Sequence, residues 1–316
     1  MQKPTIMTDS PKRLCVVIVN YNTAQLTLNC IESLTGQIDC SKDRVVVVDN
    51  NSEETDIQHL KRGVEKAGLS TWVTIIASPV NGGFAAGNNL GIKAVQAEYY
   101  LLTNADTILR PKAIAELLRA ASAHPRGGLF SPRLEWQDGE PQISCFRFHS
   151  PVSEFINSAS TALLTRLLRT FDVPLPTIDE VSRPEWTSFA CVLVRKEVFD
   201  NIGLLDQEYF MYFEDVEFCR RAKSSGYEII NWPAAHVVHL RGQSSGLKKK
   251  QREKKRLPAY YYLSRARYFT QFYGRMGFWG GNLCWLAGRP ISWGKEVVLG
   301  RERAVPEAQH IDIWKN

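Results

Sequence analysis

The chain lacks most of the short motifs that assign a protein quickly. Its seven cysteines are odd in number, scattered and without a CxxC pair, which argues against a disulfide framework and a zinc site. There is no GxxxxGK[ST] loop, the glycine-rich stretch 81–89 does not have the spacing of the dinucleotide fingerprint, and no Ser-His-Asp arrangement is suggested. The cysteine usage predicts a protein of the reducing cytoplasm.

Long apolar runs are also missing. Residues 1–13 are polar, and the apolar run 14–19 is too short for a signal peptide or a membrane span, so we expect a soluble or membrane-peripheral protein. Of the 316 residues, 44% are hydrophobic and 23% charged, enough for one α/β domain with additions or two small domains. The net charge of +6 is uneven, because residues 248–256 alone hold seven basic side chains. That run is either a solvated loop or a functional basic patch.

Strand-like and helix-like segments alternate along the first part of the chain. β-branched runs without polar alternation predict strands at 14–19, 44–48, 72–77 and 99–103, and helix-length stretches lie at 24–35, 53–67, 84–97 and 111–123. This alternation predicts a doubly wound parallel sheet. Residues 137–185 are predicted as an insertion over one side of the site, amphipathic near its middle. After it we expect a strand running into a short helix at 186–199, a helix at 213–225 and short strands at 228–231 and 236–239. A basic helical stretch follows at 257–275.

Polar residues follow four consecutive predicted strands. These strand ends read Asn20-Tyr21-Asn22, Asp49-Asn50-Asn51-Ser52, NGGFAAGNN (81–89) and Asn104-Ala105-Asp106. Ordinary turn chemistry would explain any one of them. Because ligands of such sheets bind at the carboxyl ends of the strands, all four together favour a polar binding site.

Two residues are candidate ligands for a divalent cation. Asp106 follows a strand and either caps the next helix or offers a carboxylate oxygen, which suits Mg²⁺ or Mn²⁺. His239 ends the apolar stretch AAHVVHL and is either a satisfied structural histidine or a second ligand.

The stretch YFMYFEDVEFCRR (209–221) holds three acidic residues among aromatic side chains. On a helix starting near Asp215, Glu217 lies on the solvent side between Arg220 and Arg221 and pairs with them. Glu214 and Asp215 lie at the helix start, where the helix dipole stabilises acids. Asp215 faces inward, so it is alternatively a general base, and the spacing leaves both interpretations open.

Six stretches, in order and spacing, resemble the family 2 inverting glycosyltransferases, and within them the bacterial rhamnosyltransferase-like branch. The stretches are VVIVNYNT (16–23), VVVVDNNS (45–52), NGGFAAGNNLGI (81–92), YLLTNADT (100–107), FMYFEDVEFCRRAKSSGY (210–227) and HVVHLRGQSS (236–245). The resemblance implies a GT-A fold over 14–245. Its nucleotide-sugar-binding half (14–135) and acceptor-binding half (136–245, with the insertion 137–185) would share one doubly wound, mostly parallel sheet, between a polar segment (1–13) and a basic, helical C-terminal extension (246–316).

By position, the resemblance also implies site residues. Asn22 and Asp49 would contact the base and ribose, and Asn81, Gly82 and Asn88 the nucleotide sugar. Asp106 is similar to the last acid of the family's DxD metal motif. Asn104 replaces the first acid of that motif, so fewer protein carboxylates would hold the cation. Ala105 stands where the branch usually has Pro. His239 would complete the site of Mg²⁺ or Mn²⁺ and diphosphate. Asp215 would be the general base, and Glu214 would orient the acceptor or the loop.

The implied activity is inverting transfer of a sugar, with L-rhamnose from dTDP-rhamnose as the first choice and a UDP-sugar as another donor. The acceptor would be a glycan or lipid-linked saccharide in cell-surface polysaccharide synthesis. A catalytically silent nucleotide-sugar or glycan-binding protein is the alternative. Nucleic acid is not expected as a partner, because the basic run is confined to one segment without a recognition motif.

Lipid-linked acceptors imply the cytoplasmic face of the inner membrane. Residues 248–256, the Tyr- and Arg-bearing segment 260–275, Trp279 and Trp285 are therefore predicted to dock on an anionic lipid surface. The apolar stretch 278–287 is too short to span a bilayer.

Overall fold

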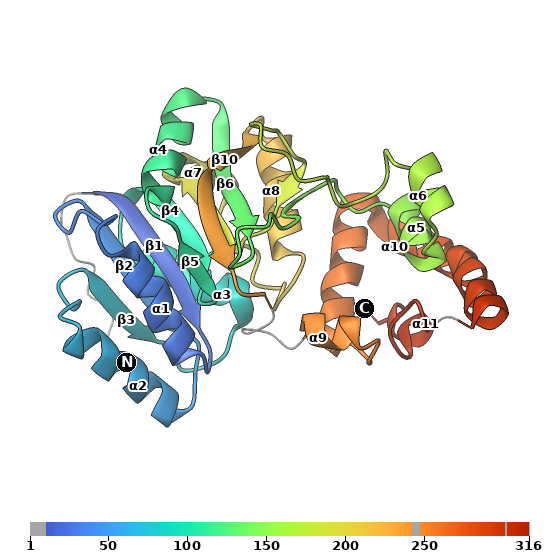
Figure 1. Cartoon of the computed structure of the whole chain (residues 1–316), viewed down its shortest axis with the longest axis horizontal. Coiled ribbons are helices and arrows are strands. Elements are labelled where there is room, and N and C mark those ends of the chain that lie inside the picture. Colours follow the sequence, from blue (N-terminus) through green and yellow to red (C-terminus); the bar gives the residue numbers. More distant parts are fainter. Residues whose placement is uncertain (1–10, 242–246, 301, 316) are drawn as a thin grey trace.

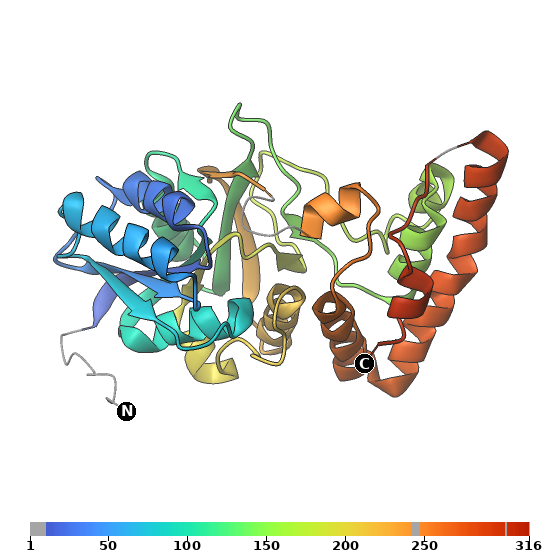
Figure 2. The same cartoon turned by 90° about the horizontal axis from the view of Figure 1, so that it is seen from below.

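The chain forms a sheet half and a helical module that lie side by side (Figures 1 and 2). The computed structural model describes residues 11–241, 247–300 and 302–315. The strands are β1 (Lys12–Asn20), β2 (Asp43–Asp49), β3 (Val73–Ala77), β4 (Ala97–Asn104), β5 (Thr107–Leu109), β6 (Gly127–Glu135), β7 (Cys145–Phe146), β8 (Trp186–Thr187), β9 (Cys191–Arg195) and β10 (Glu228–His239). The helices are α1 (Ala24–Leu34), α2 (Glu54–Lys66), α3 (Gly83–Ala94), α4 (Ala113–Ala123), α5 (Pro151–Ala159), α6 (Ala162–Leu167), α7 (Lys196–Ile202), α8 (Glu214–Ser224), α9 (Leu247–Arg252), α10 (Ala259–Leu299) and α11 (Gln309–Asp312).

Eight strands form one sheet in the order β3-β2-β1-β4-β9-β6-β10-β5. The neighbours from β3 to β4 pair in parallel, and so do β6 and β10. Strand β9 is antiparallel to both β4 and β6, and β5 is antiparallel to β10. The expected doubly wound, mostly parallel sheet is therefore confirmed, with β9 joining its two parts.

Both faces of the sheet are covered, as the uninterrupted apolar strands predict. Along β1, Leu14, Val16 and Ile18 pack in the core that includes α1, α2 and α4. The alternate residues Cys15 and Val17 pack in the second core, to which α3, α7, α8 and α10 contribute. Because successive side chains of a strand point to opposite faces, one buried strand supplies both cores.

The first four predicted strands and helices lie where the sequence places them, within about three residues at each end. The two short strands expected at 228–231 and 236–239 are instead one strand, β10, whose pairing with β6 shifts register between Trp232 and His236. The helix expected at 257–275 continues to Leu299 as α10, with a break at Gly274, whose φ is +67°. Only a residue without a Cβ adopts this left-handed conformation freely, so Gly274 divides α10 into two halves.

The helical module consists of α5, α6, α9, α10 and α11 (Figure 2). Within it α5, from the predicted insertion, packs along the second half of α10. A Cβ added at Gly288 would lie 2.2 Å from Ser158 Oγ, so the two helices meet at van der Waals distance. Arg265 of α10 donates to the Glu154 carboxylate of α5 at 2.9 Å, and both side chains are buried.

Some of the C-terminal residues expected to meet lipid are interior, whereas Trp279 is exposed. Tyr268 and Phe269, from the first half of α10, are fully buried in the core shared with α8. Trp285 is 1% exposed and packs with Tyr262 and Ile313, so its assignment to a docking surface is wrong. In the described part of the chain, no helix combines the length and hydropathy needed to cross a bilayer.

Candidate active site

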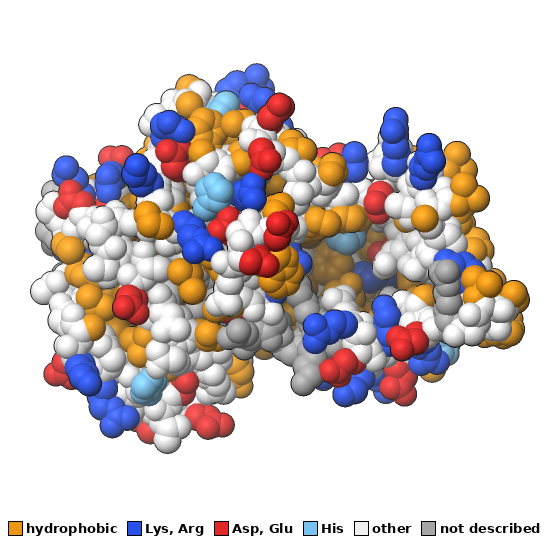
Figure 3. Space-filling view, viewed as in Figure 1, with side chains coloured by type: hydrophobic (Ala, Val, Ile, Leu, Met, Phe, Trp, Pro, Cys, Tyr) orange, Lys and Arg blue, Asp and Glu red, His pale blue; other side chains and the backbone are white. Residues whose placement is uncertain are grey.

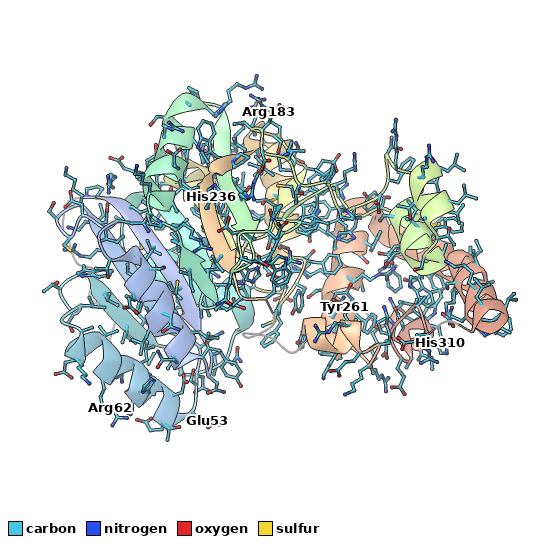
Figure 4. All side chains as sticks on the ribbon, in the orientation of Figure 1. Glu53, Arg62, Arg183, His236, Tyr261 and His310 are labelled. Atoms are coloured by element: carbon cyan, nitrogen blue, oxygen red, sulfur yellow. The ribbon has the colours of Figure 1, made fainter. Side chains whose placement is uncertain are left out.

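A hollow lies between the sheet half and the helical module (Figure 3). Its volume is about 580 Å³, and its floor is formed where β1 and β4 end and where α3 and α8 begin. The module closes one side through Gln251 and Tyr261; Tyr261, labelled in Figure 4, lies at the start of α10. The hollow therefore occupies the strand-end position at which the sequence predicts a binding site.

One wall of the hollow carries three asparagines. Asn50, Asn81 and Asn104 come from three different strand ends and all line the cavity. Asn50 Nδ2 donates to Asn81 Oδ1 at 3.0 Å, and Asn81 Oδ1 also accepts from Gly83 N at 3.0 Å. These bonds hold the loop before α3 against the end of β2. Asn81 and Asn104 were predicted as site residues, whereas Asn50 was overlooked within the quoted DNNS stretch.

Asp49 and Asn22 do not line this cavity. Asp49 is buried, and its carboxylate accepts from Asn20 Nδ2 at 2.8 Å and from Ser52 N at 3.1 Å. Asn22 accepts from Glu53 N at 2.8 Å, just before α2. It lines a second hollow on the side of α1 and α2, where Figure 4 labels Glu53. In the described structure both residues brace the strand ends.

Gly82 and Asn88 also stand back from the cavity. Gly82 N donates to Asn50 Oδ1 at 3.3 Å. Asn88 is buried in α3, where its Nδ2 donates to Phe84 O at 3.0 Å. Its Oδ1 has no hydrogen-bond partner among the described residues. These two predicted residues contribute to the shape of the loop and helix that carry Asn81.

The predicted cation ligands are brought together by strand pairing. Strand β5 follows Asp106 directly and pairs antiparallel with β10, with Thr107 opposite His239. Asp106 Oδ1 consequently lies 3.6 Å from His239 Nε2, and both side chains are buried. Within the described residues, no cluster of three or more His, Cys, Asp or Glu side chains could hold a metal. His239 lines the cavity, whereas Asp106, 133 positions earlier in the chain, is buried next to it and is not part of the cavity lining.

The acid pair Glu214 and Asp215 starts α8, and both residues line the cavity. The two preceding residues, Tyr212 and Phe213, both have φ of +69°. Left-handed conformations at non-glycine residues cost about 1–3 kcal/mol each and persist only where the surrounding structure enforces them. This strained turn aims the helix start, and with it the acid pair, into the hollow.

The two carboxyl groups have different surroundings. Burial, followed by repulsion from Asp215, raises the pKa of Glu214 well above its ordinary value. Glu214 Oε2 has no hydrogen-bond partner in the part of the chain that is described. Asp215 is only half-buried, and its Oδ1 accepts from Val216 N at 2.9 Å. The pair therefore combines a buried acid whose pKa is raised with a half-buried acid that reaches the cavity.

The prediction for Glu217 is wrong about the solvent side and about Arg220, but its pairing with Arg221 is confirmed. Its side chain is fully buried, not on the solvent side, and it receives two bonds from Arg221, at 2.6 and 2.9 Å. Gln271 of α10 also donates to it, at 3.0 Å. Arg220 does not join this pair but lies over the rings of Phe272 and Tyr273, 4.5 Å from each centroid. Helix α10 covers this face of α8, which local spacing does not reveal.

Several cavity residues were missed by the sequence reasoning. Arg241 follows His239 in the quoted HVVHLRGQSS stretch; it lines the cavity and donates to Ile143 O at 2.6 Å. An aromatic wall faces the acid pair. It consists of Phe146, His149, Trp186, Phe213 and Tyr261. Its members come from the insertion, β8, the α8 start and α10, so nothing short of the tertiary contacts would assemble them.

Taken together, the cavity has a polar side and an aromatic side with two carboxyl groups between them. The polar side offers amide groups, a carboxylate–imidazole pair and the Arg241 guanidinium, which suit a phosphorylated, hydroxyl-rich ligand. The aromatic side offers flat apolar faces of the kind that cover sugar rings. Asp215 lines the same cavity and presents a half-buried carboxyl group to it.

The amino-acid sequence of residues 15–167 matches the model of the family "Glycosyl transferase family 2". The chain is 30% identical over 150 residues to an N-acetylglucosaminyl-diphospho-decaprenol L-rhamnosyltransferase of Mycobacterium tuberculosis, covering 47% of this chain and 49% of the relative. It is 26% identical over 236 residues to the low-salt glycan biosynthesis hexosyltransferase Agl10 of Haloferax volcanii, covering 72% of this chain and 66% of that protein. The chain thus spans about half the length of the first of these relatives and about two thirds of the second.

Solved glycosyltransferases share the fold. A mannosyltransferase from Pyrobaculum calidifontis in complex with GDP-Man and Mn²⁺ superposes with a TM-score of 0.58 at 14% identity, covering 96% of this chain and 81% of that one. Residues 1–349 of S. aureus TarS superpose with a TM-score of 0.53 at 14% identity, covering 92% and 75%. These likenesses confirm the expected GT-A-type fold.

Proposed function

The chain carries a glycosyl transferase family 2 domain at residues 15–167, and we propose that it transfers a sugar from a nucleotide donor to a glycan or lipid-linked saccharide acceptor. The observation that carries the proposal is that His239, which lies 3.6 Å from the buried Asp106, lines one cavity together with the asparagine wall and the acid pair. The rhamnosyltransferase and hexosyltransferase names of the relatives favour L-rhamnose, from dTDP-rhamnose, as the sugar.

We assign the donor to the polar side of the cavity. Asn81 and Asn104, with Asn50 beside them, provide amide groups for the sugar or the phosphates. Asn22 and Asp49 brace the outer strand ends, where the base and ribose would lie, and Gly82 and Asn88 hold the loop of Asn81. Arg241 adds a cation for the diphosphate.

The buried pair Asp106 and His239 fits a divalent cation. The carboxylate oxygen and imidazole nitrogen are of the types that Mg²⁺ or Mn²⁺ bind, with nitrogen favouring Mn²⁺. His239 Nδ1 has no hydrogen-bond partner among the described residues, which leaves the ring available to a ligand. With two protein ligands, the remaining positions would fall to diphosphate oxygens and water. When bound, the cation would neutralise negative charge on the departing nucleoside diphosphate.

The acceptor would lie against the aromatic wall with its hydroxyl at Asp215. In an inverting displacement, Asp215 takes the hydroxyl proton while the oxygen forms a bond to the anomeric carbon. The bond from that carbon to the β-phosphate oxygen breaks, and the nucleoside diphosphate leaves with its electron pair. Glu214, buried and protonated, would orient Asp215 or the acceptor by donating its proton in a hydrogen bond.

Nucleoside diphosphate release from dTDP-, UDP- and GDP-sugars, with Mg²⁺ or Mn²⁺, tests the proposal. We expect turnover with one donor class, lost on addition of a chelator, and a fall of about 10²–10⁴-fold in Asp215→Asn. Equal turnover in Asp215→Asn would remove Asp215 as the base. Donor binding, seen as a higher melting temperature, without turnover under any condition would instead establish the catalytically silent binder.

A further inference from the structure

The outer face of the helical module is apolar and exposed. On the second half of α10 and on α6, large apolar side chains have exposed fractions from 39% to 83%. They are Met276, Trp279, Leu283, Ile291, Trp293, Val297, Val298 and Leu299 of α10, with Leu163 and Leu167 of α6. Figure 3 shows hydrophobic side chains gathered along the edge of the module farthest from the sheet half.

Apart from Leu299 at the helix end, the α10 residues among them repeat at the spacing of a helix face. Met276, Trp279 and Leu283 follow one another at intervals of three and four, and Ile291 and Val298 continue at intervals of seven and eight. The opposite face of the same helix is used already, because Gly288 and Ser292 are buried on the α5 side. The helix is apolar on both faces, which is normal for a helix with partners on two sides. Contiguous exposed apolar surface of this extent marks an interaction site.

The end of α10 and helix α6 belong to the same outer side. Lys295 Nζ donates to Ser160 O, at the end of α5, at 2.6 Å. This bond ties the last turns of α10 to the α5–α6 connection, two residues before α6 begins. Figures 1 and 2 show both elements at the extremity of the molecule away from the sheet. Leu163 and Leu167 are therefore exposed apolar side chains on a helix that neighbours the end of α10.

Exposed basic residues lie on the module that carries this face. Residues 247–316 hold 15 Lys and Arg against five Asp and Glu, and among them Arg256, Arg265 and Arg289 pair with acids. Arg166 and Arg169 are exposed on and after α6, and Arg275 and Lys250 are exposed elsewhere on the module. A second copy of the chain would bring these like charges together, because a two-fold interface pairs each patch with itself. An anionic surface complements them instead.

We propose that α6 and the second half of α10 form a docking face for an anionic lipid bilayer. Exposed tryptophan and aliphatic side chains enter the interfacial region, and the surrounding Lys and Arg side chains meet anionic headgroups. Gly274 divides α10 into a docking half and a half buried against α8, so docking leaves the catalytic core undisturbed. The choice of a membrane partner agrees with a lipid-linked acceptor and to that extent rests on the proposed function. The surface shares Trp279 with the sequence expectation but excludes Trp285, which is buried.

Sedimentation of the full chain with vesicles tests the docking face directly. We expect binding to phosphatidylglycerol–phosphatidylcholine vesicles that weakens as salt is raised and is much lower with phosphatidylcholine alone. The double variant Val297→Glu with Val298→Glu should bind at least about tenfold more weakly, because two apolar groups leave the face and two negative charges enter it. The matched variant Ile178→Glu with Val181→Glu, at exposed apolar positions outside the module, should bind like the wild type.

Two results would overturn the proposal. One is wild-type protein that stays in the supernatant with anionic vesicles at low salt, and the other is unchanged binding by the Val297/Val298 double variant. A wild-type dimer that the double variant converts to a monomer, without vesicle binding, would assign the face to a second copy. No donor or acceptor is present in this assay, so its failure leaves the glycosyltransferase proposal standing; turnover with a soluble acceptor tests that separately.

Discussion

Adjacent residues at the start of α8 have opposite electrostatic surroundings. Glu214 is buried with one oxygen unpartnered in the described structure, while Asp215 reaches the cavity. We expect Glu214 to be neutral at physiological pH, because burial and the neighbouring charge raise its pKa.

This difference predicts opposite outcomes for two similar amides. Glu214→Gln keeps the shape and hydrogen-bond donor of a protonated acid, so turnover should stay within about threefold of wild type. Asp215→Asn removes a proton acceptor and should lose about 10²–10⁴-fold. Steady-state nucleoside diphosphate release measures both. A loss in Glu214→Gln as large as that in Asp215→Asn would show that Glu214 acts as a charged group.

His149 gives the protein a predictable response to acid. Its ring packs against Trp186, Phe213 and Tyr268, and burial lowers its pKa from 6.5 to about 4. The unfolded chain therefore takes up this proton first as the pH falls. The contribution of the neutral His149 ring to the unfolding free energy is fully present above about pH 6.5 and is lost between pH 6.5 and 4. The loss is at most about 3 kcal/mol, because the ring also lines the cavity and is partly hydrated there.

Replacing His149 with Phe should remove that part of the pH dependence. Denaturant unfolding at pH 7.0, 5.5 and 4.5 would show a smaller loss of unfolding free energy than in wild type. The exposed His310, labelled in Figure 4, provides a control in His310→Phe. An identical loss in wild type and His149→Phe would contradict the assignment.

At the scale of elements, two loops from distant parts of the sequence meet at the cavity. Gly83, at the start of α3, has φ of +82°, and a Cβ there would lie 1.9 Å from Phe210 O. Phe84 N donates to the same oxygen at 2.9 Å. The loop that carries Asn81 is thus held directly against the loop that leads into the acid pair. Contact at this distance is available only to glycine.

Gly83→Ala should consequently destabilise the protein by at least about 2 kcal/mol, since both the backbone conformation and the contact with Phe210 are lost. Gly36→Ala is the matched control, because Gly36 has φ of +79° with nothing near its Cβ position. It should cost only the conformational term of about 1–2 kcal/mol. Chemical denaturation measures both, and equal costs would show that the loop contact carries no energy.

Over the whole molecule, the helical module is part of the folded core. Tyr268 and Phe269 of α10 lie in the same apolar cluster as Phe218 and Cys219 of α8. The buried Glu217 also depends on Gln271 of α10 for one of its hydrogen bonds. Removal of the module would expose this surface and leave Glu217 with fewer partners.

We therefore expect truncation after residue 246 to give aggregated protein or protein without a cooperative unfolding transition. The substitution Phe269→Ala removes only one buried side chain of the same interface and should lower the unfolding free energy by about 3–5 kcal/mol. Thermal and denaturant unfolding measure these effects. A soluble truncated protein with wild-type stability would mean that the sheet half folds independently. Membrane binding is for this reason better tested with surface variants than by truncation.

The sequence alone determined the sheet and the location of its site. Unbroken β-branched runs and helical stretches reflect short-range periodicity, so the first four strands and helices fell where the pattern placed them. Polar residues after Val19, Val48 and Thr103 marked the strand ends, because the ends of parallel strands share one edge. The resemblance of short motifs added the family, which the matched model confirms.

Tertiary structure decided which face of each helix is inside. Local spacing placed Glu217 in solvent, yet it is buried where α8 and α10 meet. The implied lipid-linked acceptor placed Trp285 at a membrane surface, yet it is buried beside Tyr262 and Ile313. It also decided that Asp106 meets His239, that residues of the insertion and of α10 join the aromatic wall, and that one face of the second half of α10 remains exposed. A periodic pattern shows that a helix has an apolar face, but only contacts between residues far apart in the chain determine what covers it.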